Sequence, residues 1–483
     1  MKLRFFLPIL AGLFLLPACY HSSISPNASE DADYRERYNE ILENPFIKVA
    51  DEPTSTFSID ADGGAYTNIK NLIESGQLPP ENAVRTEELI NFFPLNYDLP
   101  SGNEPMALNG EVSSCPWQQG HKLIRIGLQA KSLPRAQLPA TNWVLLIDVS
   151  GSMSDQSKLP LLKEVLTDFV DELRDQDRLS IVTYSGRVRR VLASTSGSDP
   201  DKMKKAINKL RAAGSTAGGK AIEMAYEEAV DHFIENGNNQ VVLMTDGDFN
   251  VGITDQDELI KLVEEKRKSG VFFTTIGVGR GNLNEGMMEQ LANHGNGRFE
   301  YIGNKDDGTK ILIRDFAKFY PVAKDVKIQV SFRSEAVDEY RLIGYENRVL
   351  NNQDFDNDST DAGEIGMGQN ITALYEIIPA AGGNSSSQPT ADLDFRYKNP
   401  NENTSLSMNL TILDANKSFD EASESHRFVT AVAGWGLYLF DSSFKGEVSP
   451  DMVRAIALDA RQFDPYQYRD EFIELVTLAE ELE

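Results

Sequence analysis

The chain has 483 residues, which is enough for two to four domains. Its 74 acidic residues outnumber 47 basic ones and give a net charge of −27. This balance argues against nucleic acid as a partner, because phosphate binding needs a basic surface. Of the two cysteines, Cys19 lies at a predicted processing site and Cys115 has no internal partner, so we expect a fold held together by its core without disulfides.

Residues 1–18 have the pattern of an export signal. Lys2 and Arg4 precede the apolar run 5–16, which is too short to span a bilayer. The ending Leu-Pro-Ala-Cys resembles a bacterial lipoprotein signal, which implies cleavage before Cys19 and a lipid on its sulfur. An ordinary secretory signal is the alternative, and either one takes the protein out of the cytoplasm. The polar residues 19–44 are expected to form a flexible tether.

Residues 45–137 are expected to contain a helix and several strands. Residues 53–62 alternate as a strand does, and residues 66–77 have apolar positions at helical spacing. Asp60 and Asp62 suggest either a second metal site or a turn leading into the helix, and the turn is the favoured interpretation. Two more strands are expected at 107–112 and 123–128. They should belong to a β-rich module that is completed later in the chain.

Residues 138–320 alternate between short apolar runs and helical patterns. An apolar run bounded by turn residues is typical of a strand buried on both faces. Alternation of such strands with helices predicts an α/β fold with a doubly wound, Rossmann-like parallel sheet. The predicted strands lie at 142–147, 178–184, 240–246, 271–279 and 298–302, and the predicted helices at 159–173, 203–210, 220–233, 255–268 and 287–292.

Oxygen-bearing side chains occur at three places in this region. Asp148, Ser150 and Ser152 follow the first strand, Asp246 ends the third, and Thr216 lies in a Gly-rich turn that opens a helix. The carboxyl ends of parallel strands meet at one sheet edge, where ligands bind. Carboxylate and hydroxyl oxygens suit Mg²⁺ or Mn²⁺ and not a softer metal. Each residue alone could instead cap a helix, but the three places together favour a metal site.

The order Asp-x-Ser-x-Ser, then Thr, then Asp resembles the metal-ion-dependent adhesion site of von Willebrand factor type A domains. The resemblance implies that Asp148, Ser150, Ser152, Thr216 and Asp246 hold Mg²⁺ or Mn²⁺, with one aspartate bound through water. Few direct anionic ligands would leave an open position for an Asp or Glu of a partner protein. We therefore expect a metal-dependent protein–protein interaction or adhesion module.

Two other functions are compatible with these residues. A metal-dependent hydrolase would need a general base beside the ion. The sequence contains no HExxH or GxSxG motif, so we expect no enzyme. A structural envelope scaffold would be stabilised by the metal alone, without a ligand.

Residues 321–418 switch to the period of two that is typical of half-buried strands. We expect an antiparallel sandwich that includes the strands near residues 105–131. The acidic loop 354–361 resembles the start of a Ca²⁺ loop, but Ser359 replaces the turn glycine and Ile365 stands at the position of the bidentate glutamate. A solvated acidic loop is the favoured interpretation. The predicted strands lie at 326–332, 340–345, 371–377, 393–397 and 405–411.

Residues 419–483 are predicted to be helical. The segments 53–93, 428–436 and 466–472 resemble the regions that flank the A domain in bacterial lipoproteins of the YfbK type. That resemblance implies a lipid-anchored protein of the bacterial cell envelope. Tyr20 is not the aspartate that favours retention in the inner membrane, so we expect the outer membrane.

Overall fold

The computed structural model describes residues 36–483 except 61, 103, 215–218, 248–255, 282, 383–387 and 401. The predicted leader, the predicted lipidation site Cys19 and the predicted ligand Thr216 lie outside the described residues. None of the described helices is long and apolar enough to cross a membrane.

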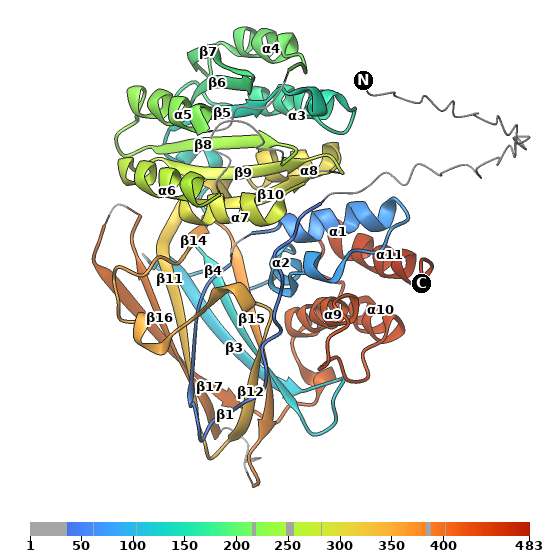
Figure 1. Ribbon diagram of the computed structural model, residues 1–483. Coiled ribbons are helices and arrows are strands. Elements are labelled where there is room, and N and C mark those ends of the chain that lie inside the picture. Colours follow the sequence, from blue (N-terminus) through green and yellow to red (C-terminus); the bar gives the residue numbers. More distant parts are fainter. Residues whose placement is uncertain are drawn as a thin grey trace, which may run out of the picture. The chain divides into compact units, whose positions relative to one another are not determined.

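The central region forms a six-stranded sheet in the order β10-β9-β8-β5-β6-β7 (Figure 1). The sheet is parallel except for the pair β6 and β7. The α/β fold class predicted from the sequence is therefore confirmed. The strands are β5 (Thr141–Asp148), β6 (Arg178–Ser185), β7 (Arg187–Ser196), β8 (Asn238–Thr245), β9 (Phe272–Val278) and β10 (Asn296–Ile302).

The antiparallel edge strand β7 was not among the predicted strands. Gly186, with φ of 56°, lets the chain reverse within one residue after β6. Arg187, Arg189 and Arg190 are exposed, as is common on an edge strand, so β7 lacks the apolar run by which the buried strands were recognised. The predicted sheet was parallel, and that prediction was wrong for this one strand pair.

Strand β5 is buried along its whole length, and its central residues 143–147 are apolar because helices cover both faces of the strand. Trp143, Leu145 and Ile147 pack with the apolar face of α3, whereas Val144 and Leu146 pack with α5 and α6. The helices of this domain are α3 (Leu159–Asp171), α4 (Pro200–Lys209), α5 (Gly219–Asp231), α6 (Gln256–Lys266), α7 (Glu285–His294) and α8 (Lys305–Thr309), which a π-turn (Lys310–Arg314) and a 3-10 turn (Phe316–Phe319) follow.

Two antiparallel sheets, built from strands before and after the central α/β region (residues 138–320, the predicted A domain), form the expected sandwich. One has the order β1-β12-β15-β4-β3 and the other β13-β2-β11-β16-β17, with β14 paired to β11. Phe332 on β11 stacks on Tyr340 of β12 with ring centroids 4.2 Å apart, which joins the two sheets. The strands are β1 (Ile47–Lys48), β2 (Thr54–Ser58), β3 (Met106–Ser114), β4 (Lys122–Ala130), β11 (Pro321–Phe332), β12 (Val337–Ile343), β13 (Val349–Leu350), β14 (Gly363–Gly366), β15 (Asn370–Pro379), β16 (Gln388–Lys398) and β17 (Ser405–Asp414).

The C-terminal helices share a core with two N-terminal helices (Figure 1). Phe93 lies 5.0 Å from Phe428 and 5.6 Å from Phe472, measured between ring centroids. Segments more than 300 residues apart in the sequence thus bury their apolar faces against each other. These helices are α1 (Gly64–Glu74), α2 (Thr86–Asn91), α9 (Glu424–Leu439), α10 (Pro450–Asp459) and α11 (Tyr468–Glu480).

Candidate metal centre

Asp148 and Asp246 lie at the carboxyl ends of the neighbouring parallel strands β5 and β8. Both residues are 0% exposed. Ser150 and Ser152 lie in the turn after β5, and their hydroxyl oxygens are 2.9 Å apart. Four of the five predicted ligands thus occupy one edge of the sheet, and the fifth, Thr216, is outside the described residues.

Hydrogen bonds fix the carboxylate of Asp148 in this turn. Its Oδ1 accepts the backbone N–H of Ser150 at 2.8 Å, and its Oδ2 accepts the hydroxyl of Thr245 at 3.0 Å. Thr245 was not predicted from the sequence, although its place directly before Asp246 was a usable signal. Gly151 donates its N–H to the carbonyl of Gly214 at 2.9 Å, which ties the first loop to the segment that precedes Thr216.

Lys158 is a second residue of the centre that the sequence did not reveal. Its Nζ donates to Oδ2 of Asp246 at 2.9 Å, and its side chain is only 8% exposed. The stem of Lys158 packs on Gly279, where an added Cβ would come within 2.3 Å of the lysine Cγ. Gly279 also has φ of 69°, so both its space and its backbone conformation require glycine.

The donor set fits a hard divalent cation. Among the described residues, Oδ1 of Asp246 accepts no hydrogen bond although it is buried. Burial, with a further contribution from Asp246, raises the pKa of Asp148 to about 6. A cation bound by the two carboxylates would satisfy the oxygen of Asp246 that accepts no hydrogen bond and would stabilise the buried charge of Asp148. The serine hydroxyls would supply neutral ligands.

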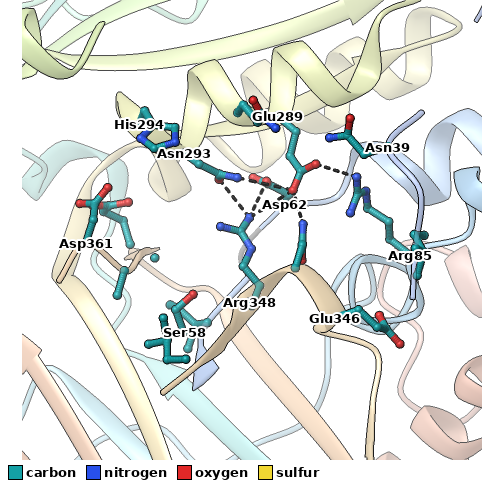
Figure 2. A pocket seen from close by; sticks show the side chains of 18 of the residues that line it. Asn39, Ser58, Asp62, Arg85, Glu289, Asn293, His294, Glu346, Arg348 and Asp361 are labelled. Atoms are coloured by element: carbon teal, nitrogen blue, oxygen red, sulfur yellow. Dashed lines mark hydrogen bonds and ion pairs between the residues drawn. The ribbon is translucent and has the colours of Figure 1, made fainter. Parts of the chain in front are cut away.

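A second cluster of buried charges surrounds a cavity of about 570 Å³ beside α7 (Figure 2). Arg348 forms ion pairs with Asp60 at 2.8 Å and Asp62 at 3.4 Å, and Arg85 forms one with Glu289 at 2.7 Å. Asp62 donates its N–H to Oδ1 of Asp60 at 2.9 Å, as expected for the turn that the sequence favoured before α1.

The remaining candidates form no such site among the described residues. Asp356 and Asp358 of the acidic loop both pair with Arg396, at 3.2 and 2.8 Å, and Asp356 is 85% exposed. This is the arrangement of a solvated acidic loop. The thiol of Cys115 is buried, and this burial raises its pKa well above the usual range, so a reactive thiolate is not formed.

Three family profiles match the chain in consecutive regions. The profile described as "von Willebrand factor" matches residues 32–125, and "von Willebrand factor type A domain" matches residues 142–312. The profile described as "Uncharacterized protein YfbK, C-terminal" matches residues 317–482. The second match covers the sheet that carries Asp148 and Asp246.

The chain is also similar to curated proteins and to solved structures. "Uncharacterized protein YfbK" of Escherichia coli K12 is 39% identical over 468 residues, which are 92% of this chain and 81% of that protein. Inter-alpha-trypsin inhibitor heavy chain H3 of Homo sapiens is 30% identical over 178 residues, 34% of this chain and 20% of its own. A solved von Willebrand factor type A protein from Catenulispora acidiphila covers 80% of this chain and 91% of its own, with 14% identity and a TM-score of 0.46.

Proposed function

Because the chain belongs to the YfbK family and contains a von Willebrand factor type A domain, we propose that it is a metal-dependent protein–protein interaction or adhesion protein. In this proposal Asp148, Ser150, Ser152, Thr216 and Asp246 hold Mg²⁺ or Mn²⁺. An Asp or Glu of the partner protein completes the coordination of the ion. The observation that carries the proposal is the pair of buried carboxylates on adjacent strand ends, one with an oxygen that lacks a hydrogen bond within the described chain.

The charge of the centre supports an anionic ligand. Asp148 and Asp246, when ionised, and the ammonium of Lys158 together carry a charge of −1. A bound divalent ion would change this to +1 in a buried environment, where an unbalanced charge is costly. An incoming carboxylate would neutralise it, so Lys158 contributes to the preference for an acidic partner.

A basic groove beside the centre also favours an acidic partner. This groove of about 560 Å³ is lined by Arg187, Arg189, Lys209 and Arg211, together with Val149 and Gly214 from the two loops of the centre. Within the described part of the chain, no acidic side chain forms an ion pair with these four basic residues. On a chain of net charge −27, such a groove would steer acidic segments toward the metal.

The N-terminal sequence places this interaction at the cell envelope in our proposal. A lipid on Cys19 would anchor the protein, and residues 19–44 would hold the A domain away from the membrane surface. The outer membrane is the proposed location. Replacing Cys19 with Ser should move the protein from the membrane fraction to the soluble fraction, and unchanged fractionation would contradict the anchor.

A pull-down from envelope extract tests the proposed function. The detergent-solubilised wild type should capture a partner with Mg²⁺ but not with EDTA, and the Asp148→Ala variant should capture none. Asp175→Asn is the matched control. Asp175 is exposed and precedes β6, so it lies at the amino ends of the parallel strands, opposite to the candidate metal centre. Equal capture by the wild type, with and without Mg²⁺, and by Asp148→Ala would refute metal-dependent binding and leave a structural scaffold as the better account.

A further inference from the structure

Three acidic side chains converge outside the A domain, where the sequence favoured only a turn. Asp60 and Asp62 lie between β2 and α1, and Glu88 comes from α2. One carboxylate oxygen of each lies within 4.8 Å of the other two, and the three residues are at most 3% exposed. Glu88 is 26 positions from Asp62 in the sequence, and no short motif links residues that far apart, which is why the cluster was not predicted.

The spacing of these oxygens fits a hard cation. Mg²⁺ and Ca²⁺ bind carboxylate oxygens at about 2.0–2.6 Å, so ligands of one ion lie no more than about 4–5 Å apart. The three carboxylate oxygens of Asp60, Asp62 and Glu88 lie within 4.8 Å of one another, which agrees with this spacing. Three carboxylates plus water would give the coordination that such ions require.

The surrounding charges are not balanced. Asp60, Asp62 and Glu88 are accompanied by the buried carboxylates of Glu87, Glu285 and Glu289. Two arginines pair with this group: Arg348 with Asp60 and Asp62, and Arg85 with Glu285 at 2.8 Å and Glu289 at 2.7 Å. Figure 2 shows the Arg348–Asp62 and Arg85–Glu289 pairs. A third buried arginine, Arg298, interacts with Asp62 but is paired with Glu300. Seven acids against three bases leave an excess of negative charge, which is costly in a buried environment unless a proton or a cation neutralises it.

Glu88 has a buried carboxylate oxygen that accepts no hydrogen bond within the described chain. Its side chain is 0% exposed, and Oε2 accepts the N–H of Ala65 at 2.8 Å, which orients the carboxylate. Oε1 accepts no hydrogen bond within the described chain, and its ion pair with Nε of Arg85 is long, at 3.5 Å. A buried carboxylate oxygen held in place without a hydrogen-bond donor is the group that a cation would satisfy.

An ion can reach this position from the cavity shown in Figure 2. Asp62 lines that cavity of about 570 Å³, together with Asn39, Arg85, Glu289 and Arg348. The volume accommodates several waters, which would hydrate the ion on entry and complete its coordination. Of the three carboxylates, Asp62 lines the cavity, whereas Asp60 and Glu88 are not among its lining residues.

We propose that Asp60, Asp62 and Glu88 bind one hard divalent cation, Ca²⁺ or Mg²⁺, at a site separate from the A-domain centre. Asp62 also accepts the backbone N–H of Phe299 in β10 at 2.8 Å, so the ion would be coupled to the A domain. The bound ion would fasten the β2–α1 turn and α2 to that domain. This site does not depend on the function proposed above.

Calorimetric titration of the Asp148→Ala variant tests the inference, because that variant lacks the A-domain centre. With Ca²⁺ or Mg²⁺ in about 150 mM KCl, which screens the net negative charge, it should bind one ion per chain, and the wild type should bind two. A saturating ion should raise the Tm of the variant by at least about 5 °C. Absence of binding to Asp148→Ala would overturn the second site, whatever the wild type binds.

Two substitutions then assign the ligands. Asp148→Ala/Glu88→Gln and Asp148→Ala/Asp60→Asn should each lose at least about tenfold in cation affinity and the associated rise in Tm. Asp148→Ala/Asp51→Asn is the matched control, since Asp51 is exposed and lies in the same N-terminal segment, and it should bind as Asp148→Ala does. Undiminished binding by both test variants would show that other residues hold the ion. If the wild type and Asp148→Ala each bind one ion, the second site stands and the A-domain centre fails.

Discussion

Lys158 and Asp246 form a buried ion pair inside the candidate metal centre. Replacing Lys158 with Met would leave Asp246 buried without its cation and should lower the free energy of unfolding in EDTA by about 3–5 kcal/mol. Mg²⁺ would take over the neutralisation, so it should raise the Tm of Lys158→Met more than that of the wild type. Differential scanning fluorimetry with Mg²⁺ and with EDTA measures both effects.

Lys163→Met is the matched control for this prediction. Lys163 lies on α3, the helix that begins directly after Lys158, but its Nζ donates to the backbone carbonyl of Asn208 at 3.1 Å and not to the centre. Its Mg²⁺-dependent shift in Tm should equal that of the wild type. A smaller Mg²⁺ shift for Lys158→Met than for the wild type would contradict the role given to Lys158.

The residues of the centre differ in how far the sequence could predict them. Asp148, Ser150, Ser152 and Asp246 belong to a spaced motif at strand ends, so topology alone brings them to one edge. Lys158 stands before a helix, where a lysine is ordinary, and only the three-dimensional path over Gly279 directs it inward. A side chain that acts through a long flexible stem leaves no periodic signal in the sequence.

Helix α9 carries a histidine, His426, that is buried neutral against the sandwich. Its Nε2 lies 3.0 Å from the hydroxyl of Ser113 on β3. Burial first, and the charge of Arg125 next, lower its pKa from 6.5 to about 3, although Glu111 opposes the shift. Because the folded-state pKa is lowered, the unfolded chain binds the proton first, and stability is lost as pH falls below 6.5 toward 3.

The substitution His426→Gln removes the titratable imidazole and keeps a polar side chain near Ser113. Between pH 7 and pH 5 the wild type should lose about 2 kcal/mol of unfolding free energy more than the variant. Urea unfolding at the two pH values measures the difference. Equal pH dependence in the two proteins would show that His426 is not buried neutral.

At the scale of elements, burial decided which predictions succeeded. The strands β5 and β8 were predicted because both of their faces are covered, which makes the apolar run continuous. Strand β7 was missed because an edge strand with exposed arginines has no such run. The almost wholly buried helix α9 was predicted for the same reason as β5, since its apolar residues extend around the helix.

The whole molecule is built from an A domain inserted between two halves of a sandwich. Strand β2 pairs with β11, and β4 pairs with β15, across the inserted domain. The sequence predicted that the strands near residues 105–131 would belong to a β-rich module completed after the A domain. It could not predict the buried charges of Arg85 and Arg348, since polar residues are normally expected at the surface.

Arg348 connects three parts of the molecule and should matter for global stability. It pairs with Asp60 and Asp62 and donates to Oδ1 of Asn293 on α7 at 3.0 Å. Replacing Arg348 with Met removes the cation from a buried acidic cluster and should cost about 3–5 kcal/mol in EDTA. Chemical denaturation followed by fluorescence and by circular dichroism measures this loss.

Arg333→Met is the control at this scale, because the pair Arg333–Asp392 is 46% and 31% exposed. An exposed pair should cost less than about 1 kcal/mol. Equal, small losses in the Arg333 and Arg348 variants would mean that the buried cluster does not hold the domains together.

The presence of a metal at the A-domain centre is tested most directly by anomalous diffraction. Crystals of the wild type and of Asp148→Ala grown with Mn²⁺ would be measured at the manganese absorption edge. We expect, in the wild type, an anomalous peak bounded by Asp148, Ser150, Ser152 and Asp246 that Asp148→Ala lacks. An intact Lys158–Asp246 pair with no peak between the two carboxylates at saturating Mn²⁺ would contradict it.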